Sequence, residues 1–140
     1  MLAGVLLGYV AMAASVFGLF AFAWVVMGSE GAFRSGSFAV SGAWVVMSLI
    51  VNVVAAVGGG NVARLVSRER TASVVLAAVI LTLGLALIIP ELGEIGAPDM
   101  RAGSVSMLDA ISRAHQPAWV MLLTPVLGAI GAYIGGRLPQ

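Results

Sequence analysis

The stretch from Ala43 to Arg70 reads AWVVMSLIVNVVAAVGGGNVARLVSRER, and it decides the fold of the chain. Its first 21 residues are mostly apolar and uncharged, whereas three arginines fall within its last seven residues. A helix of about 20 apolar residues is long enough to cross the roughly 30 Å hydrocarbon core of a bilayer. The pattern therefore predicts a transmembrane helix that ends at a basic membrane surface.

The whole chain has the composition of an integral membrane protein. Of its 140 residues, 61% are hydrophobic and 9% are charged, and the mean hydropathy is +1.09. Soluble domains carry about 25% charged residues. The net charge of +1 is too even a balance for nucleic-acid binding. The chain has no cysteine, which excludes disulfides, thiolate metal sites and cysteine nucleophiles.

Four uncharged apolar runs have about the length that a bilayer requires. Each is expected to be helical, because a helix satisfies its own backbone hydrogen bonds in lipid. The first run is too long for the apolar region of a signal peptide and has no basic residue before it, so we interpret it as a span. The sequence predicts an all-α, single-domain bundle of four transmembrane helices over residues 1–140, with spans at Leu2–Met27, Ala43–Ala63, Ala72–Ile89 and Pro117–Gly136.

The charged residues orient these spans. Basic residues are enriched in cytoplasmic loops, and four of the seven arginines fall on the side of the two termini. Five of the six acidic residues fall on the opposite side, as do Trp24, Trp44 and Trp119 at the interface that indole rings prefer. We therefore expect both termini to be cytoplasmic. The four arginines are Arg64, Arg68, Arg70 and Arg137, and the five acidic residues are Glu30, Glu91, Glu94, Asp99 and Asp109.

Two segments on the outer side have room for local structure. The first, GSEGAFRSGSFAVSG at residues 28–42, is rich in Gly and Ser, and we expect Phe33 and Phe38 to anchor it at the membrane surface. The second segment begins at Pro90 and Gly93, which are expected to stop the third helix.

The second outer segment contains a predicted short amphipathic helix at Ser104–His115. Ser106 and Asp109 have the spacing of a capping box, and Asp109 and Arg113 have the spacing of an ion pair along one helix face. The segment lacks the basic face of a lipid-targeting helix. We therefore expect it to pack on the bundle or to contact a partner.

The three glycines at residues 58–60 raise the possibility of a phosphate-binding loop. Such a loop follows a strand and usually carries a GK[ST] motif, whereas these glycines follow a membrane helix and the motif is absent. Small residues spaced four apart instead allow close helix packing in lipid, within the bundle or with other proteins. The predicted packing residues are Gly4, Gly8, Ala55, Ala56, Gly59, Gly60, Gly131 and Gly135.

The arginines that follow these glycines are expected to lie at headgroup depth. Each of Arg64, Arg68 and Arg70 would gain about 1 kcal/mol from anionic lipid. Membrane lipids are therefore the first expected partners of the chain.

Polar side chains inside the spans are few. We interpret Asn52 as hydrogen-bonded to a neighbouring helix, and lining of a pore or contact with a ligand is the alternative. Thr82 lies in the third span, and Thr124 precedes Pro125 in the fourth, where it is expected to bond the carbonyl that the proline leaves free. Because no span contains Asp, Glu, Lys or Arg, ion-coupled transport is disfavoured.

His115 is the single histidine of the chain. One imidazole does not make a protein-only metal site, and a catalytic triad with Asp109 and Ser112 cannot be assumed on one short helix. His115 is a weak candidate for the axial ligand of a haem or pigment held by a larger complex, against an ordinary interfacial role. We expect no catalytic residue, no metal and no cofactor of the chain's own other than lipid.

Three stretches resemble a group of small four-helix bacterial membrane proteins of unknown function. They are AGVLLGYV at Ala3–Val10, GSEGAFRSGSFAVSGAW at residues 28–44, and GGGNVARL at residues 58–65. The resemblance implies a place in the bacterial inner membrane, and it implies no mechanism and no functional residues.

Two functions follow as hypotheses. The first is a non-enzymatic accessory or assembly subunit of a larger membrane complex of the respiratory or photosynthetic type, with other membrane subunits as partners. The alternative is a small-solute or ion channel formed by homo-oligomers, with Asn52 and Thr82 facing the pore.

Overall fold

The computed structural model describes residues 1–93 and 96–139. Within these residues four long helices are apolar enough to cross a membrane, and no strand is present beyond three isolated backbone bridges. The predicted all-α fold with four apolar spans is confirmed. The helices are α1 (Leu2–Ala32), α2 (Gly42–Ser67), α3 (Arg70–Leu92), the short α4 (Met107–Arg113) and α5 (Ala118–Gly135).

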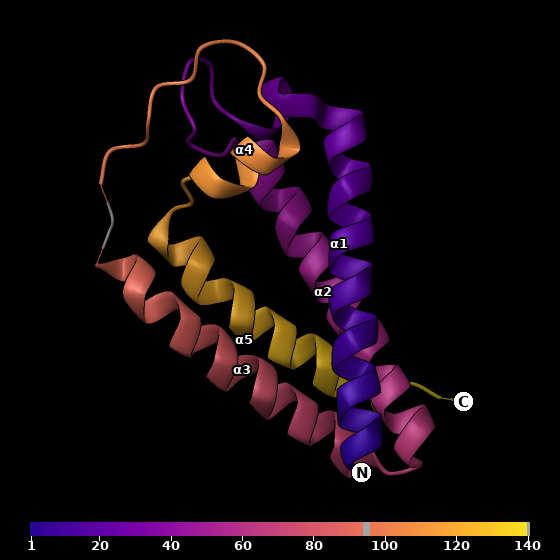
Figure 1. Ribbon diagram of the computed structural model, residues 1–140. Helices are drawn as coiled ribbons and strands as arrows, with labels where there is room; N and C mark the ends of the chain where they lie inside the picture. The colour runs from indigo at the N-terminus through magenta and orange to yellow at the C-terminus, as the bar shows by residue number, and fades with distance from the viewer. Residues whose placement is uncertain (94–95, 140) are drawn as a thin grey trace.

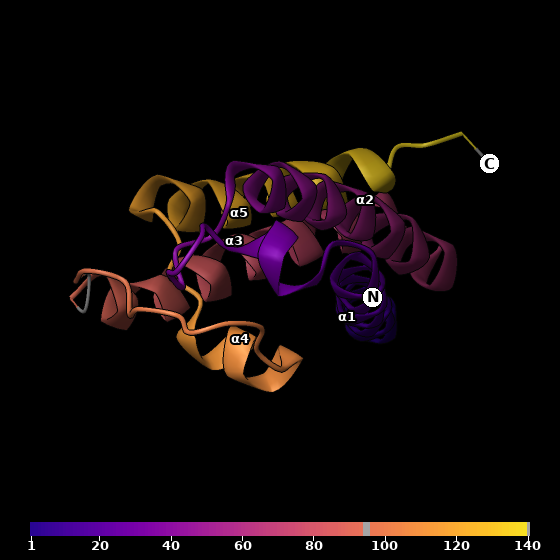
Figure 2. The ribbon, with the colours of Figure 1, turned by 90° about the horizontal axis from the view of Figure 1, so that it is seen from above.

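The four long helices form two pairs. α1 packs along α2 and α3 packs along α5, while α2 and α5 join the two pairs. The pairs meet at the end that carries both chain termini and separate toward the other end, where α4 lies in the opening between them (Figure 1, Figure 2). We call these the terminal end and the roof end. The bundle is therefore a wedge that opens toward its roof.

Glycines hold α1 against α2 at the terminal end. A Cβ atom on Gly4 would lie 2.5 Å from the carbonyl oxygen of Ala63, and a Cβ atom on Gly8 would lie 2.6 Å from that of Gly59. Side chains do not approach a backbone oxygen this closely, so only glycine lets the two helix backbones touch. The cluster around this contact includes Leu76 of α3, which is fully buried.

The contact between α2 and α5 uses the same device on the other face of α2. A Cβ atom on Gly60 would overlap the carbonyl group of Ala132, and one on Gly135 would overlap that of Val57. A Cβ atom on Gly131 would lie 3.0 Å from the Cβ of Ala56. α2 is therefore the central helix of the bundle, because it carries small residues on two faces.

The helices α1, α2 and α3 each end later than the predicted spans, and α2 ends at Ser67 rather than at Ala63. α3 continues through Pro90 to Leu92 and is capped by Gly93, so the expectation that Pro90 stops the helix is wrong and the expectation for Gly93 is confirmed. A proline removes only one backbone hydrogen bond, and the N–H of Gly93 still donates to the carbonyl of Pro90 in the last turn. α1 passes the predicted end at Met27 and breaks at Gly28, whose φ of 61° favours glycine, before a last helical turn. Glu94 lies outside the described residues.

α4 is shorter than the predicted Ser104–His115 helix. Ser106 caps it, because its hydroxyl accepts a hydrogen bond of 3.2 Å from the N–H of Asp109. Among the described residues the expected ion pair between Asp109 and Arg113 does not form. The guanidinium of Arg113 instead lies 5.5 Å from the ring centroid of Phe38, which places it over an aromatic face.

Candidate functional site

The roof end is held together by one buried arginine. The side chain of Arg101 is 2% exposed, and its Nη1 donates to Oε1 of Glu30 at 2.7 Å and to the carbonyl oxygen of Gly103. Its Nε donates to the carbonyl oxygen of Ser37 at 3.4 Å. Arg101 therefore connects the end of α1, the first outer segment and the second outer segment. Sequence reasoning missed this residue, because its partners are far away along the chain.

The ion pair shifts the titration of both groups, which lie beyond the apolar run that ends at Met27. The hydrogen bond from Arg101 and its positive charge hold the pKa of Glu30 below the ordinary value of 4.5. The same hydrogen bond raises the pKa of the Arg101 guanidinium. Both groups are therefore charged at neutral pH.

Phe33 and Phe38 are buried within the roof. Their side chains are 4% and 2% exposed and meet edge to face with ring centroids 5.5 Å apart. The expectation that they anchor the segment at the membrane surface is wrong. The backbone explains their burial, because Phe38 donates to the carbonyl of Asp99 and accepts from the N–H of His115, which draws the two outer segments together.

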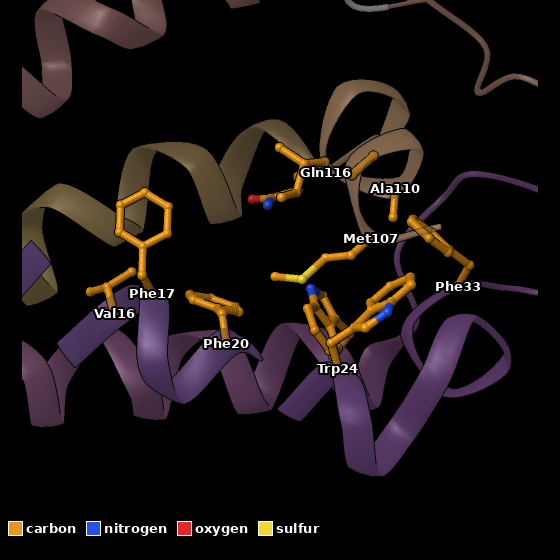
Figure 3. A pocket seen from close by; sticks show the side chains of 11 residues that line it. Val16, Phe17, Phe20, Trp24, Phe33, Met107, Ala110 and Gln116 are labelled. Atoms are coloured by element: carbon orange, nitrogen blue, oxygen red, sulfur yellow. The ribbon is translucent and has the colours of Figure 1, made fainter. Parts of the chain in front are cut away.

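An apolar cavity of about 250 Å³ lies beneath this roof, between α1 and α4. In Figure 3 the rings of Phe20 and Trp24 on α1 lie opposite Met107 and Ala110 of α4, and the side chain of Gln116 reaches into the space between. The Trp24 ring also packs edge to face on Trp44, with centroids 6.1 Å apart. The roof end of α1 is thus held by aromatic contacts rather than by glycines.

A second cavity of about 340 Å³ extends toward the middle of the bundle. Its walls come from Tyr9 and Met12 of α1 and from Leu83 and Leu87 of α3, and Asn52 and Gln116 are among its few polar residues. Neither this cavity nor the first has a charged residue in its lining. We call the two together the wedge cavity.

A third cavity of about 430 Å³ lies on the outer side of the wedge cavity and is charged. Glu91, Asp99, Arg113 and His115 are among the residues that line it. We call it the vestibule. Gln116 lines the vestibule and both parts of the wedge cavity, so an uncharged and a charged space border on one amide side chain.

The predicted polar residues of the spans lie in different surroundings. The Nδ2 of Asn52 donates to the carbonyl oxygen of Thr124 at 2.7 Å and so joins α2 to α5. The hydroxyl of Thr82 donates to Ala78 within its own helix, and Thr82 lines none of the three cavities. The structure therefore brings Asn52 to Thr124 and leaves Thr82 apart, so no contact favours a pore shared by Asn52 and Thr82.

Thr124 does not have the hydrogen bond that the sequence predicts. A proline at position 125 frees the carbonyl of Met121, four residues before it. The hydroxyl of Thr124 instead donates to the carbonyl of Val120 at 2.8 Å. Four residues back is the natural reach of a threonine hydroxyl on its own helix, which explains the difference. α5 continues through Pro125 as one uninterrupted helix.

The predicted headgroup arginines divide into two kinds. Nη1 of Arg64 donates to the carbonyl oxygens of Gly136 at 3.2 Å and of Leu138 at 2.7 Å, where α5 has ended. Arg68 and Arg70 are exposed at the tight turn between α2 and α3. Arg64 therefore fastens the end of α5, and the other two remain available to lipid headgroups.

No family model, curated protein or solved structure matches the chain. The resemblance to small four-helix bacterial membrane proteins accordingly stays a prediction. Within residues 1–93 and 96–139, no group of three His, Cys, Asp or Glu side chains lies close enough to hold a metal ion. The described residues form an uncharged apolar space, the wedge cavity, beside the vestibule, whose lining includes residues of both charges.

Proposed function

We propose that the protein is a non-enzymatic, multi-pass subunit of the bacterial cytoplasmic membrane that assists or assembles a larger membrane complex of the respiratory or photosynthetic type. The exposure of α1 is the observation that supports this proposal. Only 6% of the most apolar stretch of α1 is buried within the chain, whereas the value is 28% for α2, 22% for α3 and 33% for α5. α1 is thus the span that its own chain covers least.

The exposed side of α1 carries large side chains. Phe22, Val25 and Val26 are each about two-thirds or more exposed, and they lie on the part of α1 that extends beyond the glycine contacts. Lipid supplies no hydrophobic force for helix association, so van der Waals contact with a well-fitting helix is what such a surface gains from a partner. This surface is the proposed contact with a larger complex.

Site-specific photocrosslinking in native membranes tests this role. A photoreactive residue in place of Phe22 is expected to capture one protein at fixed stoichiometry. The same residue in place of Leu85 on α3 serves as the control and is expected to capture lipid. Capture of lipid alone from both positions, together with purification of the chain as a free monomer or homodimer, would contradict the accessory role.

The proposed orientation places both termini in the cytoplasm and the roof outside, in line with the arginine count. The chain has no cysteine, so a maleimide can label only a cysteine that is introduced by substitution. A membrane-impermeant maleimide added to cells is expected to label Ser35→Cys in the roof and to leave Arg68→Cys at the terminal end unlabelled. The reverse pattern would invert the orientation.

A further inference from the structure

The wedge cavity has the shape and polarity of a site for a lipid tail. The α1 residues that line its two parts lie between Tyr9 and Trp24, a stretch of about 22 Å of helix, and both parts border on Gln116. That stretch is most of the roughly 30 Å hydrocarbon thickness of a bilayer. The lining of the wedge cavity is uncharged, and the larger of the cavity's two parts, about 340 Å³, falls in the range of small-molecule sites, while the smaller is about 250 Å³. Water at this depth would find few polar partners, so an apolar chain is the occupant that fits.

The vestibule beside it has charges of both signs that are not paired with each other. The ion pair found within the described residues joins Arg101 to Glu30, outside the vestibule. Arg113 contacts the ring of Phe38, and Asp99 and Glu91 have no cationic partner in the part of the chain that the structure describes. An incoming head that carries both an anion and a cation complements such a lining.

We propose that the wedge cavity and the vestibule together bind one phospholipid with an amine-bearing zwitterionic head, as in phosphatidylethanolamine. The acyl chain occupies the wedge cavity, and the phosphate faces Arg113. The ammonium faces Asp99 and Glu91, and Gln116 hydrogen bonds with the ester groups at the junction. The amide of Gln116 suits this place, because no hydrogen bond to another described residue occupies it.

The charges and the roof favour this occupant over two others. An anionic lipid would leave the carboxylates of Asp99 and Glu91 beside a net negative head, which costs affinity. A transmembrane helix of a partner would have to pass through the roof end, and α4 lies across that opening (Figure 1). A single zwitterionic lipid avoids the charge conflict with Asp99 and Glu91. It also does not have to pass through the roof, because it can enter from the surrounding bilayer.

Native mass spectrometry of the purified full-length chain tests the proposal. The protein is reconstituted in vesicles of phosphatidylcholine with equal minor amounts of phosphatidylethanolamine and phosphatidylglycerol, and then transferred to mild detergent. Phosphatidylethanolamine is expected to be retained about tenfold over the other two lipids, as one charge-assisted hydrogen bond provides. Equal retention of phosphatidylethanolamine and phosphatidylglycerol would overturn recognition of the amine.

A matched pair of variants on α3 tests the wedge cavity. Leu83 lines the cavity and is 48% exposed, whereas Leu85 lies outside the three cavities and is 39% exposed. Leu83→Trp is expected to reduce lipid retention about tenfold, and Leu85→Trp is expected to leave it unchanged. If Leu83→Trp does not fold, Val16→Trp with Leu19→Trp as its control makes the same comparison on α1. Equal retention within the folded pair would overturn the site.

Head recognition is tested separately. Asp99→Asn is expected to remove the preference for phosphatidylethanolamine over phosphatidylcholine, while Arg34→Gln, outside the vestibule, is expected to keep it. An unchanged preference in Asp99→Asn and in Glu91→Gln would overturn the role of the carboxylates. These measurements use the chain alone, so they hold or fail independently of the accessory role.

Discussion

The guanidinium of Arg101 and the carboxylate of Glu30 lie 2.7 Å apart although they are 71 positions apart in the chain. This pair joins the end of α1 to the second outer segment. Because the second outer segment also carries Asp99 and α4, the pair holds the vestibule and the roof of the wedge cavity in place. The stability of the roof therefore depends on one buried arginine.

Arg101→Gln is expected to destabilise the roof strongly. The change removes the charge partner of Glu30 and leaves the carbonyl oxygen of Ser37 without its donor, so a lower melting temperature is expected. Thermal unfolding in detergent measures this loss. The exposed Arg34→Gln is the control, with an expected change within about 0.5 kcal/mol. Equal stability of the two variants would show that Arg101 does not hold the roof.

The Glu30 carboxylate makes this contribution dependent on pH. Its folded-state pKa lies below the ordinary 4.5, so the stabilisation is complete above that value and is lost as the pH falls through the folded-state pKa. The melting temperatures of the unsubstituted chain and of Glu30→Gln are therefore expected to differ at neutral pH and to converge in acid. A difference that stayed constant down to strongly acidic pH would refute the assignment.

Gly60→Ala is expected to separate α2 from α5. The added methyl group would overlap the carbonyl of Ala132, a backbone atom that cannot rotate away, at a cost of about 1–3 kcal/mol or more. Gly58→Ala is the matched control on the same helix, because its Cβ would meet nothing within 4 Å. That control is expected to stabilise the helix by up to about 1 kcal/mol. Chemical unfolding in mixed micelles distinguishes the two, and similar values would argue against the close contact.

Asn52→Leu is expected to weaken the joint between α2 and α5 by about 1 kcal/mol, since it removes the donor to the carbonyl of Thr124. Thr82→Val removes only a bond within one helix and is expected to change stability less. Unfolding of both variants in detergent gives the comparison. Liposomes whose solute flux disappeared in Asn52→Leu at unchanged stability would favour the channel hypothesis instead.

Arg64 and Arg68 are expected to respond differently to the same substitution. Arg64→Gln removes the donor to the carbonyls that follow α5 and is expected to lower stability by about 1 kcal/mol. Arg68→Gln is expected to leave stability unchanged and to weaken binding to anionic vesicles. Unfolding and vesicle flotation measure the two effects. Loss of vesicle binding in Arg64→Gln alone would reverse these roles.

Local sequence patterns were sufficient for the long helices and for several glycines at their contacts, but not for Gly84, which lies against Pro125 between α3 and α5. The predicted small residues of α1, α2 and α5 lie where the helix backbones touch, as Gly8 does against Gly59. Errors arose where one local rule met a competing contact. Arg113 has the spacing to pair with Asp109, yet its guanidinium lies over the ring of Phe38, because the outer segments fold over each other.

The candidate site could not be found from the sequence. Gln116 and Arg101 have no unusual neighbours along the chain, and Leu83 looks like any other leucine of an apolar span. Their positions depend on how far the two helix pairs separate at the roof end. Neither the hydrophobic periodicity of the sequence nor any motif in it predicts that separation. Among the polar residues that the sequence singled out within the spans, Thr82 and Thr124 donate their hydroxyl hydrogen bonds to carbonyls of their own helices.

By itself, the sequence determined that four apolar helices form and where each lies, because the length and polarity of a segment are properties of that segment alone. Only the tertiary structure decided that these helices make a wedge rather than an even bundle, and that a buried arginine closes its roof. Those features arise from contacts between distant segments, in which packing at the glycine-lined end leaves the other end open for the outer loops to cover.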